Sequence, residues 1–260
     1  MKRKLFCGLL TAALLMQPAF SARRVQVQVD GDLLSTHSYV EQGVTYVPLR
    51  SLLDAFDGWD IRWDAERRSA VAVSGSGTII ADPASDVIQV NDSSLSGRVT
   101  VENGRTYVPL RLVTEALGGT AQWDRYLDGA AVTSPGASYN AADLYWLSRI
   151  ISAESQGEPL TGQIAVGNVV MNRVASDEFP DTISGVVFDR KNGVQFEPVS
   201  NGTVFLSPTA RSVAAAKQVL DGQVVLEDAL YFYAPALSQG VWINANRVYN
   251  TTIGCHRFYL

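Results

Sequence analysis

An internal repeat constrains this chain more than any other feature of its sequence. The segment "GVTYVPLRSLLDAF" at residues 43–56 returns as "GRTYVPLRLVTEAL" at residues 104–117. Each copy is followed by a Trp-Asp pair, at residues 63–64 and at residues 123–124. Self-similarity of this kind indicates one unit of supersecondary structure that is used twice. The first half of the chain is therefore predicted to contain two copies of one small unit.

Both copies carry the same order of local signals. "VQVDGD" at 27–32 and "IQVNDS" at 88–93 predict a strand and a tight turn at the front of each unit. "TYVPL" is predicted to be an edge strand, because Pro48 and Pro109 cannot donate a hydrogen bond to a neighbouring strand. A short amphipathic helix and a returning strand follow. Each unit is predicted to be a small β-rich element with one packed helix.

Together, the "TYVPLR" and Trp-Asp motifs resemble the N-terminal, stalk-type domain of copper amine oxidases over about residues 25–133. Copper prefers imidazole or thiolate ligands, and this stretch holds only His37 and no cysteine. No metal site is therefore predicted, and the resemblance implies a spacer or wall-associated module. Arg50 and Arg111 lie at the starts of the two predicted helices. They could anchor a ligand, but the more ordinary interpretation is that each forms a local hydrogen bond.

A change of pattern separates the two halves of the chain. "TSPGASYNAA" is rich in Pro, Gly, Ser and Asn, so residues 134–142 are predicted to be a linker. Residues 143–260 are predicted to be mainly helical, with aromatic and amide groups in loops such as "YFYAPALSQGVW". Aromatic faces cover sugar rings while amides bond hydroxyl groups, so these loops suit a carbohydrate groove. The predicted fold class is two domains, a β-rich α+β module and a mainly α domain.

The first 21 residues have the features of a secretory signal peptide. "MKRK" is a basic start, "LFCGLLTAALLM" is an apolar core, and small residues end the segment. No later segment approaches the length of a membrane span. Removing the three basic residues of "MKRK" changes the net charge from −5 to −8, since 18 basic and 26 acidic residues remain. An exported, acidic protein is a poor binder of nucleic acid or anionic membranes.

Glu154 is the residue of the second half that most needs an explanation. By helical period it follows Leu147 and Ile151 on one apolar face. A buried carboxyl group is costly unless it is paired or kept protonated. Two interpretations stay open on position alone: a salt-bridged structural glutamate, or a catalytic acid whose pKa is raised by burial.

The second half of the chain has few residues for other catalytic mechanisms. It has no G-x-S-x-G, H-E-x-x-H or P-loop motif, and His256 is its only histidine. Cys255 stands beside His256, but adjacent residues rarely align as nucleophile and base. Once Cys7 leaves with the signal peptide, Cys255 has no partner for an internal disulfide. Cys255 is therefore predicted to be a small buried side chain.

Four ordered motifs carry a second resemblance: "ISAESQGEPLTGQIAVGNVVMNRV", "VQFEPVSNG", "ALYFYAP" and "IGCHRFY". They are similar to the SleB-type, spore cortex-lytic cell wall hydrolases over nearly all of residues 143–260. The resemblance implies a lysozyme-like helical fold and lytic transglycosylase action on peptidoglycan strands, without a metal or cofactor. It places the family acid on Glu154, with Glu158 as possible support. The residues that it implies for the groove are Gln195, Phe196, Tyr231 and Tyr233. Ala234, where an asparagine-like residue is expected, departs from the family pattern.

The resemblance also implies a mechanism with a single acid. Glu154 would protonate the leaving glycosidic oxygen and then take the proton of the sugar's own C6 hydroxyl, which closes a 1,6-anhydro ring. Conventional glycosidases instead use two carboxylates. A hydrolytic muramidase with the same acid and a non-catalytic wall-binding module remain alternatives. The expected location is the cell wall or the spore envelope, and any regulatory partner protein is unknown.

Overall fold

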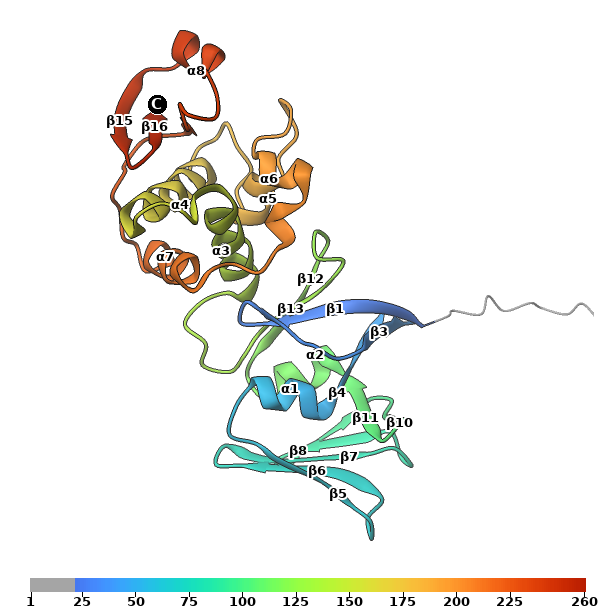
Figure 1. Ribbon diagram of the computed structural model, residues 1–260. Helices are drawn as coiled ribbons and strands as arrows, with labels where there is room; N and C mark the ends of the chain where they lie inside the picture. Colours follow the sequence, from blue (N-terminus) through green and yellow to red (C-terminus); the bar gives the residue numbers. More distant parts are fainter. Residues whose placement is uncertain (1–21) are drawn as a thin grey trace, which may run out of the picture.

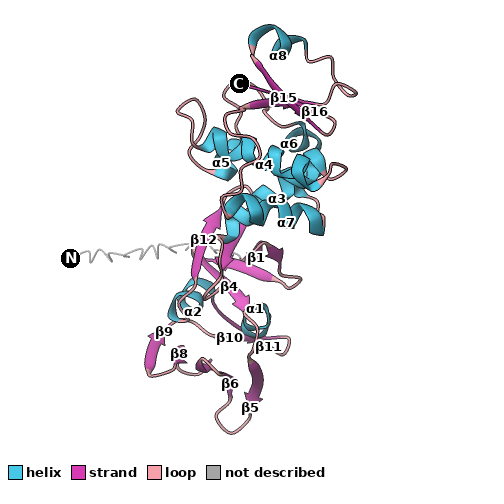
Figure 2. Cartoon of the chain, turned by 90° about the vertical axis from the view of Figure 1, so that its left-hand side faces the viewer, coloured by secondary structure: helices cyan, strands magenta, loops and turns pink. Residues whose placement is uncertain are grey.

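The computed structural model describes residues 22–260, and the predicted signal peptide at 1–21 lies outside the described residues. Its elements form two groups that follow each other along the chain. The first, from β1 to β13, is rich in strands, and the second begins with helix α3 (Figures 1 and 2). The coarse expectation of a sheet-rich half followed by a helical half is confirmed.

The sheet-rich half contains two sheets and two short helices. One sheet has the strand order β10-β11-β4-β3-β1-β13-β12, with β2 paired to β1, and the other has the order β5-β6-β7-β8-β9. The strands are β1 Arg23–Val29, β2 Asp32–Leu33, β3 Ser38–Glu41, β4 Val44–Pro48, β5 Asp60–Asp64, β6 Ser69–Ser74, β7 Gly77–Asp82, β8 Val87–Val90, β9 Ser93–Ser96, β10 Thr100–Glu102, β11 Arg105–Pro109, β12 Thr120–Asp124 and β13 Gly129–Thr133. The helices are α1 Leu49–Ala55 and α2 Leu110–Ala116.

The two similar segments meet in the larger sheet. Strands β4 and β11 pair antiparallel, with Val47 opposite Val108. The prediction that both are edge strands is wrong, because β4 also pairs with β3 and β11 with β10. Pro48 and Pro109 are the last residues of their strands and precede the helices directly, with φ near −60° in each. The prolines thus end strands inside the sheet.

Local interactions in this half agree with the turn and helix predictions. The β1–β2 turn has Asp30 and Gly31 at φ values of 50° and 98°, as a tight hairpin turn requires. Arg50 donates to the carbonyl of Ile61 and Arg111 to that of Ala121, so both arginines are locally bonded. Across residues 22–260, no group of three His, Cys, Asp or Glu side chains could hold a metal ion.

The helical half is built around α3, which packs against α4 and α7. Its helices are α3 Ala141–Ser155, α4 Leu160–Val174, α5 Ile183–Val187, α6 Glu197–Asn201, α7 Ala210–Leu220 and α8 Val241–Asn246, with a 3-10 turn η1 at Thr203–Phe205. Asn140 caps α3 by accepting from the backbone N–H groups of Ala142 and Asp143. None of the helices in the described part of the chain is long and apolar enough to span a membrane.

Aromatic segments near the C-terminus differ from their prediction as loops. They form a three-stranded sheet in the order β14-β16-β15, with bounds Tyr231–Tyr233, His256–Tyr259 and Tyr249–Ile253. Phe232 lies opposite Phe258, and Phe258 is fully buried in a cluster with residues of α4. Packing of Phe232 against the buried Phe258 gives the short segments a reason to form strands.

The two halves contact each other through the second Trp-Asp segment. Trp146 of α3 is fully buried, and its Nε1 donates to Oδ2 of Asp124 at 2.6 Å. Tyr126 stacks on Phe188 with ring centroids 4.1 Å apart. The backbone N–H of Ala141 donates to Oγ1 of Thr133, so the predicted linker bridges elements that already touch. The first half is packed against the helix that carries Glu154.

Candidate active site

Glu154 lies in the last turn of α3, where the helix approaches its end at Ser155. No hydrogen bond or ion pair of its carboxyl group is found within residues 22–260. Burial raises the pKa of Glu154 to about 7, and the negative charge of Glu197 raises it further, while the positive charge of Arg173 opposes both. The absence of an ion pair among the described residues argues against a salt-bridged structural glutamate, one of the two interpretations that the sequence left open.

A cavity of about 330 Å³ opens beside Glu154. Glu197 enters it from the first residue of α6, so two carboxylates share one cavity. The other side chains of this cavity are those of Arg149, Ser152, Ala153, Gln156, Pro198, Asn201, Thr203, Leu206, Ser207 and Leu237. An unpaired acid with a raised pKa in a cavity marks a candidate catalytic centre. We call this space the acid cavity.

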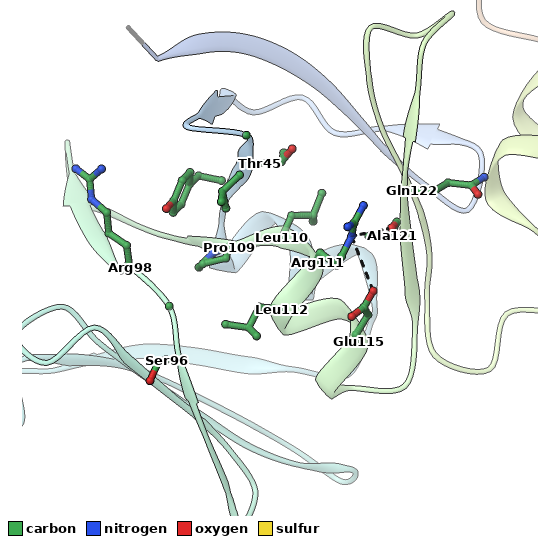
Figure 3. A pocket seen from close by; sticks show the side chains of 14 residues that line it. Thr45, Ser96, Arg98, Pro109, Leu110, Arg111, Leu112, Glu115, Ala121 and Gln122 are labelled. Atoms are coloured by element: carbon green, nitrogen blue, oxygen red, sulfur yellow. Dashed lines mark hydrogen bonds and ion pairs between the residues drawn. The ribbon is translucent and has the colours of Figure 1, made fainter. Parts of the chain in front are cut away.

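A cavity of about 420 Å³ in the sheet-rich half lacks these features (Figure 3). On α2, Nε of Arg111 forms an ion pair with Oε1 of Glu115 at 3.9 Å. The same Nε donates to the carbonyl of Ala121. Arg98, at the other side of this cavity, pairs with Glu41. Because its charges are paired, this cavity presents no group prepared for acid–base chemistry.

Arg173 is a buried cation whose charge acts on Glu154, and sequence reasoning missed it. It lies on α4 with its Nε donating to the carbonyl of Leu230 at 2.7 Å, and its Nη1 has no partner among the described residues. Burial lowers the pKa of its guanidinium to about 10. By helical period, Arg173 follows Val166 and Val170 on one apolar face. The same count that singled out Glu154 on its own helix could therefore have found Arg173.

Glu158 belongs to a different environment, although it is only four residues from Glu154. It is 8% exposed, and its Oε2 accepts from the backbone N–H of Cys255 at 2.9 Å. Its Oε1 lies 3.9 Å from Nδ1 of His256. Burial lowers the pKa of His256, and Glu158 opposes that shift. Glu158 therefore ties the turn between α3 and α4 to the β15–β16 hairpin and does not face the acid cavity.

Cys255 is exposed, so the prediction of a buried side chain is wrong. It lies in the hairpin turn between β15 and β16, where no core covers it. The hydrogen bond and charge of Glu158 raise the pKa of the Cys255 thiol. A thiol with a raised pKa is a poor nucleophile at neutral pH, which argues against a Cys–His pair.

The residues predicted for the groove take different positions. Phe196 is 2% exposed, and the guanidinium of Arg173 lies 5.0 Å from its ring centre. Its prediction as a sugar contact is corrected, because a buried ring under Arg173 has no free face. Gln195 is half-buried, two residues before Glu197. Tyr231 and Tyr233 are half-buried in β14, and the Tyr231 ring centre lies 5.5 Å from the guanidinium of Arg173.

Two family models match the chain, one in each half. Residues 28–128 match the copper amine oxidase N-terminal domain, and residues 157–259 match the cell wall hydrolase family. The second match begins just after Glu154. The chain therefore carries a cell wall hydrolase domain behind a copper amine oxidase N-terminal domain.

Similar proteins come from species of Bacillus. A spore cortex-lytic enzyme of Bacillus cereus is 33% identical over 126 residues, which are 48% of this chain and 47% of that protein. One of Bacillus subtilis is 31% identical over 119 residues, or 46% and 38% of the two chains. The solved catalytic domain of the germination-specific lytic transglycosylase SleB from Bacillus anthracis is 33% identical, with a TM-score of 0.43, and the match covers 47% of this chain and 98% of that one. The chain spans about half the length or less of these curated relatives.

Proposed function

Since the second half of this chain carries a cell wall hydrolase domain, we propose that it cleaves the glycan strands of peptidoglycan, with Glu154 as its acid. The observation that carries the proposal is the unpaired carboxyl group of Glu154, whose pKa is raised to about 7 beside the acid cavity. A general acid works best when its pKa lies near the working pH. At neutral pH a large fraction of Glu154 is protonated and able to donate.

The first step breaks the bond between N-acetylmuramic acid and N-acetylglucosamine. Protonated Glu154 donates its proton to the oxygen that leaves C1 of the muramic acid residue. Positive charge then develops at C1, and Glu154 becomes a carboxylate. The positive charge of Arg173 favours that carboxylate, as its lowering effect on the pKa of Glu154 indicates.

The second step needs no further acid. The Glu154 carboxylate removes the proton of the C6 hydroxyl of the same sugar, and the C6 oxygen bonds to C1. This closes a 1,6-anhydro ring and returns Glu154 to its protonated state. An attacking group held within the substrate makes the step intramolecular, which saves the entropy of capturing water.

Glu197 favours one alternative, a hydrolytic muramidase. It is a second carboxylate in the acid cavity, and conventional glycosidases use two carboxylates to attack with water. In that reaction Glu197 would activate a water while Glu154 remains the acid. The product would then be a free reducing end instead of an anhydro end.

The finer expectations from the sequence belong to the same proposal. The helical half has a lysozyme-like fold, and Gln195, Tyr231 and Tyr233 line the groove that continues from the acid cavity. The two repeated units of residues 25–133 form an exported spacer at the cell wall or spore envelope. The names of the relatives support spore cortex peptidoglycan as the substrate. An unpaired acid in a cavity argues against a non-catalytic wall-binding module.

Mass spectrometry of the released muropeptides tests the reaction. Purified sacculi and spore cortex are digested with the full chain, and the ends of the products are identified. The proposal expects anhydro ends, which are lighter than reducing ends by one water. Reducing ends alone would assign the hydrolytic alternative, and an absence of soluble products from both substrates would reject the proposed function.

A further inference from the structure

Helix α8 is unusual because it buries none of its residues. Trp242, within it, is 58% exposed, and Leu237, just before it, is 89% exposed. In both views α8 lies at the end of the molecule farthest from the sheet-rich half (Figures 1 and 2). Short helices form in proteins mainly because they pack an apolar face against the rest of the fold. Another interaction must hold α8 in place.

Polar contacts supply that interaction. Asn244 donates from Nδ2 to Oη of Tyr233 at 3.0 Å, and Tyr259 donates from Oη to Oδ1 of Asn244 at 2.6 Å. Gly240 precedes the helix at a φ of 57°, and a Cβ atom there would lie 2.4 Å from the ring of Tyr233. The close approach therefore requires glycine, and it fixes the start of α8 against β14.

The indole ring of Trp242 is held by two neighbours and still faces solvent. The guanidinium of Arg247 lies 5.3 Å from its ring centre, and the ring of Tyr231 lies 6.1 Å away at an angle of 60°. Arg247 is itself fixed, because its Nη2 donates to Oη of Tyr231 at 2.6 Å. A large apolar ring that is ordered before binding loses little entropy when a ligand covers it.

The segment from 234 to 246 borders the acid cavity. Leu237 lines that cavity together with Glu154 and Glu197. At its other end, Trp242 contacts Tyr231, whose ring centre lies 5.5 Å from the guanidinium of Arg173. Two separate paths thus connect the exposed segment to the surroundings of Glu154.

The chemistry of this segment indicates a neutral ligand. "APALSQGVWINAN" contains no ionisable side chain, and it offers amide groups beside the indole ring. Aromatic faces with nearby amides suit the apolar faces and the hydroxyl and acetamido groups of sugars. The guanidinium of Arg247, one residue beyond this segment, is engaged by the Trp242 ring and by Oη of Tyr231.

We propose that Trp242 is a sugar-stacking residue of a glycan subsite that continues the acid cavity along α8. The identity of the ligand rests on the proposed function, because a glycan strand that places its scissile bond at Glu154 extends past Leu237. Trp242 binds an acetylated sugar of that strand and takes no part in bond cleavage. Its role is to hold the strand in register.

Glycan binding without turnover is the test. The full-length Glu154→Gln protein is titrated by calorimetry with soluble tetrasaccharides of alternating N-acetylglucosamine and N-acetylmuramic acid, and Trp242→Ala and Trp242→Phe are then added to it. Trp63→Ala is the matched control, since Trp63 is an exposed tryptophan of the sheet-rich half. We expect Trp242→Ala to weaken binding at least tenfold, Trp242→Phe to keep most of it, and Trp63→Ala to leave it unchanged.

Three outcomes decide the proposal. Equal affinity of the Trp242→Ala variant, folded by circular dichroism, would overturn it. So would a tetrasaccharide that fails to bind any variant, which would instead direct attention to a protein partner for the exposed segment. If Trp242→Ala weakens binding while Glu154→Gln still cleaves peptidoglycan, the subsite stands and the assignment of the acid falls, so the two proposals fail separately.

Discussion

Glu154 and Glu158 are four residues apart, yet the structure gives them opposite environments. Glu154 is an unpaired acid beside a cavity, and burial together with the charge of Glu197 raises its pKa to about 7. Glu158 is buried against the C-terminal hairpin, where it accepts a backbone hydrogen bond from Cys255. Residue type and motif position do not separate the two. The comparison teaches that the packing of distant elements decides which carboxyl group is prepared for chemistry.

The two carboxyl groups also differ in their effect on the stability of the fold. An unpaired carboxyl group in a partly buried place, such as that of Glu154, destabilises the fold when it ionises. A buried carboxylate that accepts a backbone hydrogen bond stabilises it. Glu154 therefore works against the folded state at neutral pH, and Glu158 works for it.

The largest effect is expected on turnover in the Glu154→Gln protein. Glutamine keeps the shape of the side chain but cannot supply a proton. General acid–base catalysis contributes about 10²–10⁴-fold, and Glu154 holds both roles in the proposed mechanism, so we expect a loss at the upper end of that range or beyond. Muropeptide release measures the loss, with circular dichroism to verify folding. Glu158→Gln is the matched control and should keep most of the activity; a Glu158→Gln enzyme that is the more impaired of the two would reverse the comparison.

The same Glu154→Gln substitution should make the protein more stable at alkaline pH. The folded-state pKa of about 7 lies above the ordinary value of 4.5, so the folded state binds more protons between these values and loses stability as the pH rises through them. At about 1.4 kcal/mol per pKa unit, the gain is on the order of 3 kcal/mol at pH 8.

Below pH 4 the gain should vanish, because the carboxyl group is then protonated in both states. Denaturant unfolding at pH 4 and pH 8 measures the free energy of unfolding at each. A wild-type protein whose unfolding free energy exceeds that of Glu154→Gln at pH 8 would show that the carboxylate is paired after all.

A smaller and opposite effect is expected for Glu158→Ala. The change removes the part-buried hydrogen bond from the backbone N–H of Cys255, and a typical hydrogen bond contributes about 0.5–1.5 kcal/mol. Urea unfolding at pH 7 checks the loss. Glu158→Gln should recover part of it, because the amide oxygen can accept the same bond. Unchanged stability in the alanine variant would mean that the hairpin is held by other contacts.

The smallest effect is expected for Glu197→Gln. Its negative charge raises the pKa of Glu154, so removing that charge should lower the pKa and move the alkaline limb of the pH–rate profile to lower pH. We expect a shift of at most about one unit, since burial is the larger cause. A folded variant whose activity is lost at every pH would instead give Glu197 a direct role in the reaction and favour the hydrolytic mechanism.

The sequence predicts local features of this molecule well. Repeated motifs gave the strand–helix order of the first half, and helical period placed Glu154 on the buried face of α3. Both depend on neighbours along the chain. The edge-strand prediction failed because it treated the proline as a property of the whole strand, whereas Pro48 lies at the strand's last residue.

Long-range packing explains what the sequence did not reveal. Glu197 and Arg173 reach the surroundings of Glu154 from α6 and α4, and no local pattern states which helices meet. Phe196 was expected in the groove and Cys255 in the core, and each has the opposite exposure. Aromatic and cysteine residues fit both environments, so only the tertiary structure decides between them.

Direct titration of the carboxyl groups is the most decisive measurement. Glutamate side chains labelled with ¹³C are followed by NMR from pH 3 to pH 9 in the full chain, and Glu154→Gln and Glu158→Gln proteins assign the resonances. The account predicts a carboxyl group that titrates near pH 7 and disappears in Glu154→Gln alone. If the resonance lost in Glu154→Gln titrates near its ordinary value of 4.5, Glu154 is not the prepared acid and the central claim is wrong.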